Sequence, residues 1–182
     1  VHATAGNHNN LIGLPLTVLS APEDTEVLVL ELGMNHAGEI TRLTSVARPT
    51  VAVITNVGTS HIGLLGSREN IARAKAEIVS GMRSFGSIES TLIQASAGDY
   101  TKFIADEFAR PAHVVCKTVG ATEADVMSAQ KITLDEEGLP TATLSAASGW
   151  SRTVTLEVPG RVVVDDLLLA LEAIETLGLD LD

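Results

Sequence analysis

Short apolar runs separated by segments of helical periodicity are the feature that most constrains the fold of this chain. The runs at residues 26–32, 50–55 and 91–94 are rich in Val, Ile and Leu. Hydrophobic residues make up 45% of the chain and aromatic residues only 3%, so aliphatic side chains must build the core. Continuous aliphatic runs are typical of parallel strands that helices cover on both faces. The sequence therefore predicts an α/β fold with a mainly parallel sheet flanked by helices.

The remaining elements follow the same alternation up to Gly120. Two further strands are expected at residues 1–5 and 112–116, and one helix is expected to begin after Ser67, a suitable N-cap. Other helices are expected at residues 11–19, 38–47, 99–110 and 164–177. After Gly120, three strands joined by polar turns are expected at residues 125–134, 139–145 and 152–158. We expect one domain over residues 1–182, in which residues 125–158 form a small antiparallel sheet.

Charge and cysteine content exclude several classes of function. The formal net charge of −11 argues against a nucleic-acid-binding surface, which needs a basic face. The single cysteine, Cys116, permits no internal disulfide and no cysteine-rich zinc site, as in a reducing compartment. No apolar run approaches the roughly 20 residues of a membrane span, and no signal peptide is evident. We expect a cytoplasmic protein with no nucleic-acid partner and no membrane span.

Lys75 lies at an unusual place on the helix expected after residue 67. Ile71, Ala74, Ile78 and Met82 form an apolar stripe at 3.6 residues per turn, and Lys75 projects about 40° from Ile71. A lysine at the edge of a core must extend its amine to water, meet an anion or change its charge chemically. The residues alone favour the first of these outcomes.

Three of the expected parallel strands end in polar clusters, at residues 4–10, 31–36 and 55–61. Ligands bind at the carboxyl ends of the strands in such sheets, because loops and helix N-termini open there. Glu31, His61 and Lys75 are therefore expected to face one cavity.

Structural explanations of these residues remain open at this point. Glu31 suits a strand-end carboxylate paired with an arginine, and His61 suits a capping or packing residue at the start of a helix. Asparagine-rich turns, such as residues 7–10, usually satisfy their own backbone. Composition and periodicity alone lead no further than an α/β ligand-binding domain.

The polar clusters resemble the central ATPase domain of the Mur ligases. Four blocks carry this resemblance: Thr-Ala-Gly-Asn-His-Asn-Asn-Leu-Ile-Gly-Leu-Pro from residue 4, Glu-Leu-Gly-Met-Asn-His-Ala-Gly-Glu-Ile from residue 31, residues 56–67, and Ala-Arg-Ala-Lys-Ala-Glu-Ile from residue 72. The four blocks resemble those of the family in their order and in the spacing between them. A general similarity to the family covers nearly the whole chain. The block beginning at Glu31 resembles the members that add D-alanyl-D-alanine.

The resemblance implies an ATP-dependent amide ligase of peptidoglycan precursor synthesis. ATP would phosphorylate the terminal carboxylate of a UDP-N-acetylmuramoyl-tripeptide, and the amine of D-Ala-D-Ala would attack the acyl phosphate. Phosphoryl transfer between two anions needs cations, so the resemblance implies Mg²⁺ beside ATP.

The resemblance also assigns roles to the matched residues. Glu31 would ligate one Mg²⁺, and His61 would ligate a second, although this ion prefers oxygen ligands. Lys75 matches a lysine that CO₂ converts to a carbamate, an anion able to hold magnesium. These three residues are the implied catalytic and metal-binding set. The residues implied to line the phosphates and the incoming substrate are Asn7, Asn10, Asn35 and His36.

The chain departs from the family pattern in two places. The phosphate loop ending in Gly-Lys-Thr or Gly-Lys-Ser is expected upstream of Val1, in a longer polypeptide that also supplies the N-terminal and C-terminal domains. We therefore expect this segment alone to be inactive. After Arg161, where members usually carry His-Asn and a later Asn toward the adenine, the residues are Val162, Val163 and Asp166. Arg161 and Asp166 remain the expected nucleotide contacts, although Asp166 accepts a hydrogen bond and cannot donate one as asparagine does.

Two other functions remain in competition with this one. The first is a Mur-type ligase with a different amino-acid substrate. The second is a non-catalytic Mur-like binding module, which the residues Val162 and Asp166 favour slightly. The set Glu31, His61 and Lys75 speaks against a non-catalytic module.

Overall fold

The computed structural model describes residues 1–122 and 124–181, so Glu123 and Asp182 of the expected domain lie outside the described residues. The strands are β1 (His2–Ala3), β2 (Leu28–Val29), β3 (Val51–Ile54), β4 (Thr91–Ala95), β5 (Val115–Gly120), β6 (Met127–Leu134), β7 (Pro140–Ala146) and β8 (Ser151–Thr155). The α-helices are α1 (Gly13–Leu19), α2 (Glu39–Ala47), α3 (Ile62–Leu65), α4 (Arg68–Ala76), α5 (Thr101–Ile104) and α6 (Val162–Thr176). A 3₁₀ turn, η1 (Glu77–Gly81), continues α4, and a π turn, η2 (Ala105–Ala109), continues α5.

Six strands form the main sheet, in the order β3-β4-β5-β6-β7-β8. The pairs from β3 to β6 are parallel, and the pairs β6-β7 and β7-β8 are antiparallel. Val119 of β5 pairs with Met127 of β6, so the antiparallel strands continue the parallel sheet. This architecture confirms the predicted α/β class, with a mostly parallel sheet and an antiparallel part.

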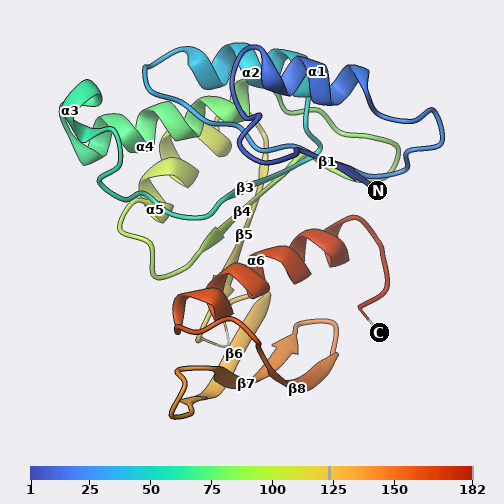
Figure 1. Ribbon diagram of the computed structural model, residues 1–182, viewed down its shortest axis with the longest axis vertical. Coiled ribbons are helices and arrows are strands. Elements are labelled where there is room, and N and C mark those ends of the chain that lie inside the picture. Colours follow the sequence, from blue (N-terminus) through green and yellow to red (C-terminus); the bar gives the residue numbers. More distant parts are fainter. Residues whose placement is uncertain (123, 182) are drawn as a thin grey trace.

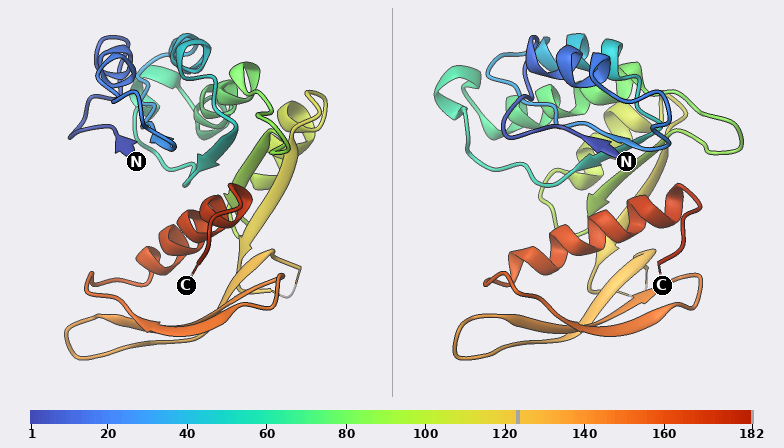
Figure 2. Two further views of the ribbon diagram at one scale, coloured as in Figure 1. Left: turned by 90° about the vertical axis from the view of Figure 1, so that its right-hand side faces the viewer. Right: turned by 45° about the vertical axis from the view of Figure 1, so that its right-hand side comes forward.

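Helices cover both faces of this sheet (Figure 1). On one face, α4, η1, α5 and η2 pack against β3 and β4 through a core that includes Ala72, Leu92 and Ile104. On the other face, α6 packs through Leu168 and Leu169, and the sheet curves so that β6 to β8 lie beneath this helix (Figure 2). A third cluster of Leu14, Ile40 and Leu43 joins α1 to α2. None of the described helices is long and apolar enough to cross a membrane.

The strand expected at residues 26–32 is much shorter than predicted. Only Leu28 and Val29 pair, with His2 and Ala3 of β1, and the two strands form a separate parallel sheet. Leu28 is 36% exposed and Val29 53% exposed, so the run is not a buried strand of the main sheet. Its other leucines, Leu30 and Leu32, pack instead beside α1 and α2. An apolar run specifies burial, but its strand partners are set by distant segments.

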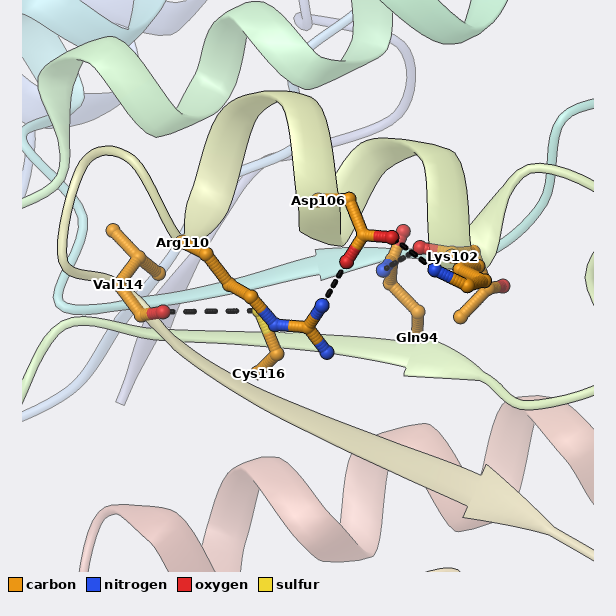
Figure 3. Close-up of polar contacts among 7 residues, drawn as sticks. Gln94, Lys102, Asp106, Arg110, Val114 and Cys116 are labelled. Atoms are coloured by element: carbon orange, nitrogen blue, oxygen red, sulfur yellow. Dashed lines mark hydrogen bonds and ion pairs between the residues drawn. The ribbon is translucent and has the colours of Figure 1, made fainter.

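The strand expected at residues 112–116 begins later, at Val115. The chain turns through His113, whose φ of 58° is left-handed and ends the regular backbone there. Beside this turn, Asp106 of η2 forms ion pairs with Lys102 and Arg110, and the Cys116 thiol donates to the carbonyl of Val114 at 3.7 Å (Figure 3). Burial raises the pKa of the Cys116 thiol, and the charge of Arg110 partly offsets this rise. Burial therefore favours the neutral thiol of Cys116 over its thiolate.

The helix that carries Lys75 begins as predicted. The Ser67 hydroxyl accepts a hydrogen bond from the Asn70 amide at 3.1 Å, so Ser67 is its N-cap. Ile71 and Ala74 of the expected stripe are buried. The α-helix ends at Ala76, earlier than the stripe predicted, because the chain tightens into η1 and then becomes extended at Met82.

Candidate functional site

A hollow of about 430 Å³ lies where the N-terminal segment meets the loops after β2 and β3. It brings together three predicted asparagines and His61, which come from three separate parts of the sequence. Its lining residues are Asn7, Asn9, Asn10, Leu11, Ile12, Gly33, Met34, Asn35, Glu39, Leu43 and His61. Amide and imidazole groups therefore dominate the polar part of this hollow.

The loop before α1 is held in shape by its own asparagines. The Asn10 side-chain oxygen accepts hydrogen bonds from the amides of Ile12 and Gly13, at 3.0 and 2.9 Å. This arrangement is the turn-forming role that asparagine-rich segments usually have. The Asn10 side-chain nitrogen remains the atom through which this residue can meet a ligand.

Asn9, which the sequence analysis did not single out, connects this loop to the end of β2. Its side-chain nitrogen donates to Oε1 of Glu31 at 2.7 Å, and its carbonyl accepts from the Gly33 amide at 2.7 Å. A Cβ on Gly33 would lie 2.7 Å from the Asn9 side chain, so only glycine permits this approach. The signal for Asn9 was its position within the Asn-rich block, but periodicity could not rank one asparagine above another.

Glu31 is exposed and is not among the residues that line the hollow, but its carboxylate is hydrogen-bonded to Asn9, which is. Its amide donates to the Thr4 hydroxyl at 2.9 Å, which joins the ends of β1 and β2. Within residues 1–122 and 124–181, no arginine or lysine pairs with the Glu31 carboxylate. The sequence left open that Glu31 pairs with an arginine, and the described residues show no such ion pair. The Glu31 carboxylate can therefore accept a cation.

His61 lines the hollow from the loop after β3. It is the residue before α3 and has a left-handed backbone, with φ of 64°. Its carbonyl accepts from the amides of Leu64 and Leu65, whereas its ring makes no capping hydrogen bond to the described helix. The ring is exposed and free to meet a ligand.

Lys75 is half-buried on α4, and burial lowers the pKa of its amine. Its side chain forms no hydrogen bond or ion pair with any residue that the structure describes. It is not among the lining residues of the hollow that contains His61. Glu31, His61 and Lys75 were expected to face one cavity. Among the described residues, neither Glu31 nor Lys75 shares the hollow that His61 lines.

His36 lies in a second hollow, of about 400 Å³, between the start of α2 and α4. Its neighbour Glu39 accepts hydrogen bonds from the amides of Asn35 and His36 at 2.6 and 3.1 Å, and these bonds lower the pKa of Glu39. Glu77 accepts from the amides of Gly38 and Thr41 and so ties η1 to the start of α2. Glu39 and Glu77 therefore fix the turn that presents Asn35 and His36, although sequence reasoning missed both.

Arg161 and Asp166 lie at the start of α6, and both are exposed. They line neither of the two hollows. The structure therefore places the expected adenine contacts apart from the asparagine-lined hollow.

The donor set around the first hollow fits a hard cation better than a soft one. Carboxylate and amide oxygens are the ligands that Mg²⁺ prefers. Among the described residues, no group of three or more His, Cys, Asp and Glu side chains gathers closely enough to hold a metal ion. A complete metal site would therefore need further oxygens, from a substrate or from water.

Comparison with known proteins assigns this arrangement to a family. Residues 1–174 match the model of the Mur ligase middle domain. The chain belongs to the Mur ligase family. This middle domain is 59% identical over 86 residues to the UDP-N-acetylmuramoyl-tripeptide–D-alanyl-D-alanine ligase of Bacillus subtilis, a match that covers 47% of the chain and 19% of that protein. It is 37% identical over 146 residues to the ligase of the same name from Mycobacterium tuberculosis, covering 80% of the chain and 27% of the relative.

Solved structures agree with the assignment. The middle domain matches MurF from Acinetobacter baumannii with a TM-score of 0.88 and 31% identity, over 98% of the chain and 37% of that protein. It matches the MurF ligase of Thermotoga maritima in complex with ADP with a TM-score of 0.78 and 28% identity, over 99% of the chain and 40% of that protein. The chain thus spans less than half the length of each of these four relatives. These matches confirm the Mur ligase fold that the sequence blocks predicted.

Proposed function

We propose that this chain is the central, ATP-binding domain of a cytoplasmic ligase that joins D-Ala-D-Ala to UDP-N-acetylmuramoyl-tripeptide. The 59% identity to the Bacillus subtilis ligase of that name is the observation that supports this choice most strongly. The likeness to a MurF ligase in complex with ADP supports a nucleotide substrate. The N-terminal and C-terminal domains of the same polypeptide would supply the remaining contacts.

The proposed reaction has two steps. The γ-phosphoryl group of ATP passes to the terminal carboxylate of the tripeptide, which gives an acyl phosphate and ADP. The amine of D-Ala-D-Ala then attacks the acyl carbon, the bond to the phosphate oxygen breaks, and the amine loses a proton. The first step is needed because phosphate leaves a carbonyl carbon more readily than an oxide does.

Glu31, His61 and Lys75 are the residues that we propose to hold Mg²⁺. When bound, the ion would neutralise charge on the transferring phosphoryl group. The exposed Glu31 carboxylate pairs with no cation in the described chain, and the His61 ring is open to the hollow. Their unused donor capacity supports this assignment.

Lys75 would act as a carbamate. Only a neutral amine adds CO₂, and the reaction releases a proton as the C–N bond forms. Burial lowers the pKa of Lys75 and no described anion stabilises its charged form, so the neutral amine is more abundant than in an exposed lysine. The half-buried position on α4 therefore favours the modification.

The polar residues around the hollows would bind the anionic substrates. Asn7, Asn35 and the free nitrogen of Asn10 can donate hydrogen bonds to phosphate oxygens. His36 would meet the substrate from the second hollow. At α6, Arg161 would contact the nucleotide, and Asp166 would accept a hydrogen bond from the adenine amino group.

Substrate-dependent ADP release by the full-length protein tests this function. We expect ADP only when UDP-N-acetylmuramoyl-tripeptide and D-Ala-D-Ala are both present, measured with a coupled ADP assay. L-Ala-L-Ala is the matched control and should release none. Equal ADP without the dipeptide would remove the ligase assignment. Preference for another amino acid would indicate a different Mur-type ligase, and no ADP with both substrates would favour the non-catalytic module.

A further inference from the structure

Arg68 lies on the same face of α4 as Lys75. It is the first residue of the helix, seven positions before Lys75, and seven steps of 100° return to nearly the same direction. Ala72, between them, is fully buried against the sheet. The Arg68 Nε is buried and has no hydrogen-bond partner among the described residues. Because an unpaired buried donor is costly, the contacts made by the rest of this guanidinium must outweigh that cost.

The Arg68 guanidinium connects two loops of the sheet edge. Its Nη2 donates to the Val57 carbonyl at 2.8 Å and pairs with the Asp99 carboxylate at 2.7 Å. The guanidinium carbon also lies 5.3 Å from the centre of the Tyr100 ring. Val57 belongs to the loop after β3, and Asp99 and Tyr100 belong to the loop after β4.

The short helix α3 follows the loop after β3, and the first turn of α4 holds the end of α3 as well. Asn70 donates from its side-chain nitrogen to the Leu65 carbonyl at 2.7 Å. His61 lies between Val57 and Leu65, in a left-handed conformation that residues other than glycine adopt only with support. Arg68 and Asn70 together form a clamp, which we name the α4 clamp, on the segment that presents His61.

We propose that Arg68 is a positioning residue that holds the His61 loop in register with Lys75. This inference rests on the proposed function, in which both residues hold Mg²⁺. Arg68 touches no reacting group in this role; it acts through the Val57 carbonyl. Arginine suits the task because its planar fork reaches a carbonyl and a carboxylate together while stacking on a ring, which a lysine ammonium cannot do.

Arg73 provides a matched control on the same helix. It also pairs with a carboxylate, that of Glu69 at 2.8 Å, and its guanidinium carbon lies 4.9 Å from the centre of the Phe103 ring. It donates to no described loop carbonyl. Arg68→Gln and Arg73→Gln therefore remove similar contacts from α4, but only the first releases the His61 loop.

Hydrogen exchange of the metal-free, full-length protein tests the clamp directly. In Arg68→Gln, the amides of residues 57–66 should exchange about tenfold faster than in the unmodified protein, because a charge-assisted hydrogen bond is lost. Arg73→Gln should leave them unchanged, and Arg68→Lys should lie between. Unchanged protection of β4 and β5 shows that a variant is folded. If Arg68→Gln does not fold, Arg68→Lys decides the result.

The Mg²⁺ dependence of ADP formation tests the consequence for the site. Supporting residues around metal ligands typically contribute 10- to 100-fold to metal affinity, so Arg68→Gln should raise the half-saturating Mg²⁺ concentration by about that factor. Lys102→Gln, at a side chain that is 86% exposed, should not. Wild-type exchange in Arg68→Gln would overturn the clamp, and faster exchange with unchanged Mg²⁺ dependence would overturn its link to the metal. Failure of the unmodified protein to form ADP would instead refute the proposed function, and the exchange comparison would still stand.

Discussion

At the scale of single residues, Lys75 is the most informative position in the chain. The helical wheel predicted its place at the edge of the packing surface, and in the structure its side chain is half-buried, which lowers the pKa of its amine. Its burial and lack of a described partner could not be read from periodicity, which does not say what lies opposite a side chain.

Replacing Lys75 tests whether its side chain takes part in the reaction or has only a structural role. Lys75→Ala in the full-length protein should reduce ADP formation by at least about a hundredfold, as the loss of an electrostatic group at a reacting centre commonly does. A short carboxylate such as acetate should restore part of the rate by taking the place of the carbamate. Lys102→Ala, at a side chain that is 86% exposed, is the matched control. An unaffected Lys75→Ala variant would return this lysine to a structural role.

Asp125 is a second residue whose charge matters, in this case for stability. It is only 7% exposed, and its Oδ2 accepts from the Ser96 hydroxyl and from the amide and hydroxyl of Thr122. Burial raises the pKa of Asp125, but hydrogen bonds from Thr122, Thr118 and Ser96 outweigh it, so the pKa lies below its ordinary value of 3.8. The folded state therefore binds this proton more weakly than the unfolded state.

The stability contribution of Asp125 should consequently depend on pH. Asp125→Asn should lower the free energy of unfolding by about 1–3 kcal/mol at neutral pH, because charge-assisted hydrogen bonds are lost. The difference from the unmodified protein should be complete above pH 5 or so and shrink as the pH falls below about 3.8 through the lowered pKa. Urea unfolding across this range measures it, with Asp24→Asn on an exposed turn as control. A difference that grows toward acid would contradict the assignment.

At the scale of elements, an ion pair between a half-buried lysine and a buried glutamate joins β5 to α6. Lys117 Nζ lies 2.7 Å from Oε1 of Glu172, which also accepts from the Thr176 hydroxyl at 3.0 Å. Glu172 is fully buried, and its Oε2 has no partner among the described residues. This pair therefore helps to specify how α6 lies on the sheet. The same arrangement leaves one buried carboxylate oxygen without a hydrogen bond in the described part of the chain.

Removing one member of this pair should lower the free energy of unfolding more than removing both. Lys117→Met should lower the free energy of unfolding by about 3–5 kcal/mol, because Glu172 would remain buried without a cation. The double variant Lys117→Met, Glu172→Leu should recover most of that loss. Thermal unfolding of the three proteins decides the matter. A double variant at least as unstable as the single one would show that packing, and not the uncompensated charge, sets the cost.

The elements also show where sequence reasoning succeeds. Ser67 and the alternating strands are local signals, and α1, α2, α6 and the antiparallel strands appear close to where they were predicted. The segments at residues 26–32 and 112–116 were wrong in extent, because their length depends on partners far away in the sequence. The separate β1-β2 sheet was also not predicted, because it depends on pairing between two segments far apart in the sequence.

At the scale of the whole molecule, most of the predicted site residues are divided between two hollows and the start of α6. The sequence blocks assigned roles to residues from separate segments, and the structure gathers Asn7, Asn10, Asn35 and His61 around one hollow. The other predicted site residues do not line it: Glu31, His36, Lys75, Arg161 and Asp166. Their convergence on one site stays a prediction, because a sequence pattern does not give the distances between loops and these residues do not all line either of the two hollows.

The share of its relatives that this chain spans leads to a prediction about the activity of the isolated chain. Because it spans 37% of the Acinetobacter baumannii MurF, we expect residues 1–182 alone to release no ADP above background when both substrates are supplied. The full-length protein at the same concentration is the control in the same coupled assay. Comparable turnover by the two would mean that the chain already contains a complete nucleotide site.

Trp150 gives this architecture a practical consequence. It is the single tryptophan of the chain, and it packs beside the core that α6 shares with β6 to β8. The asparagine-lined hollow contains no aromatic side chain other than the imidazole of His61. Intrinsic fluorescence will therefore report on the curved end of the sheet and will not respond to a ligand in the hollow unless α6 or the strands beneath it move. A fluorescence change on nucleotide addition would identify the α6 end of the domain as the part that responds.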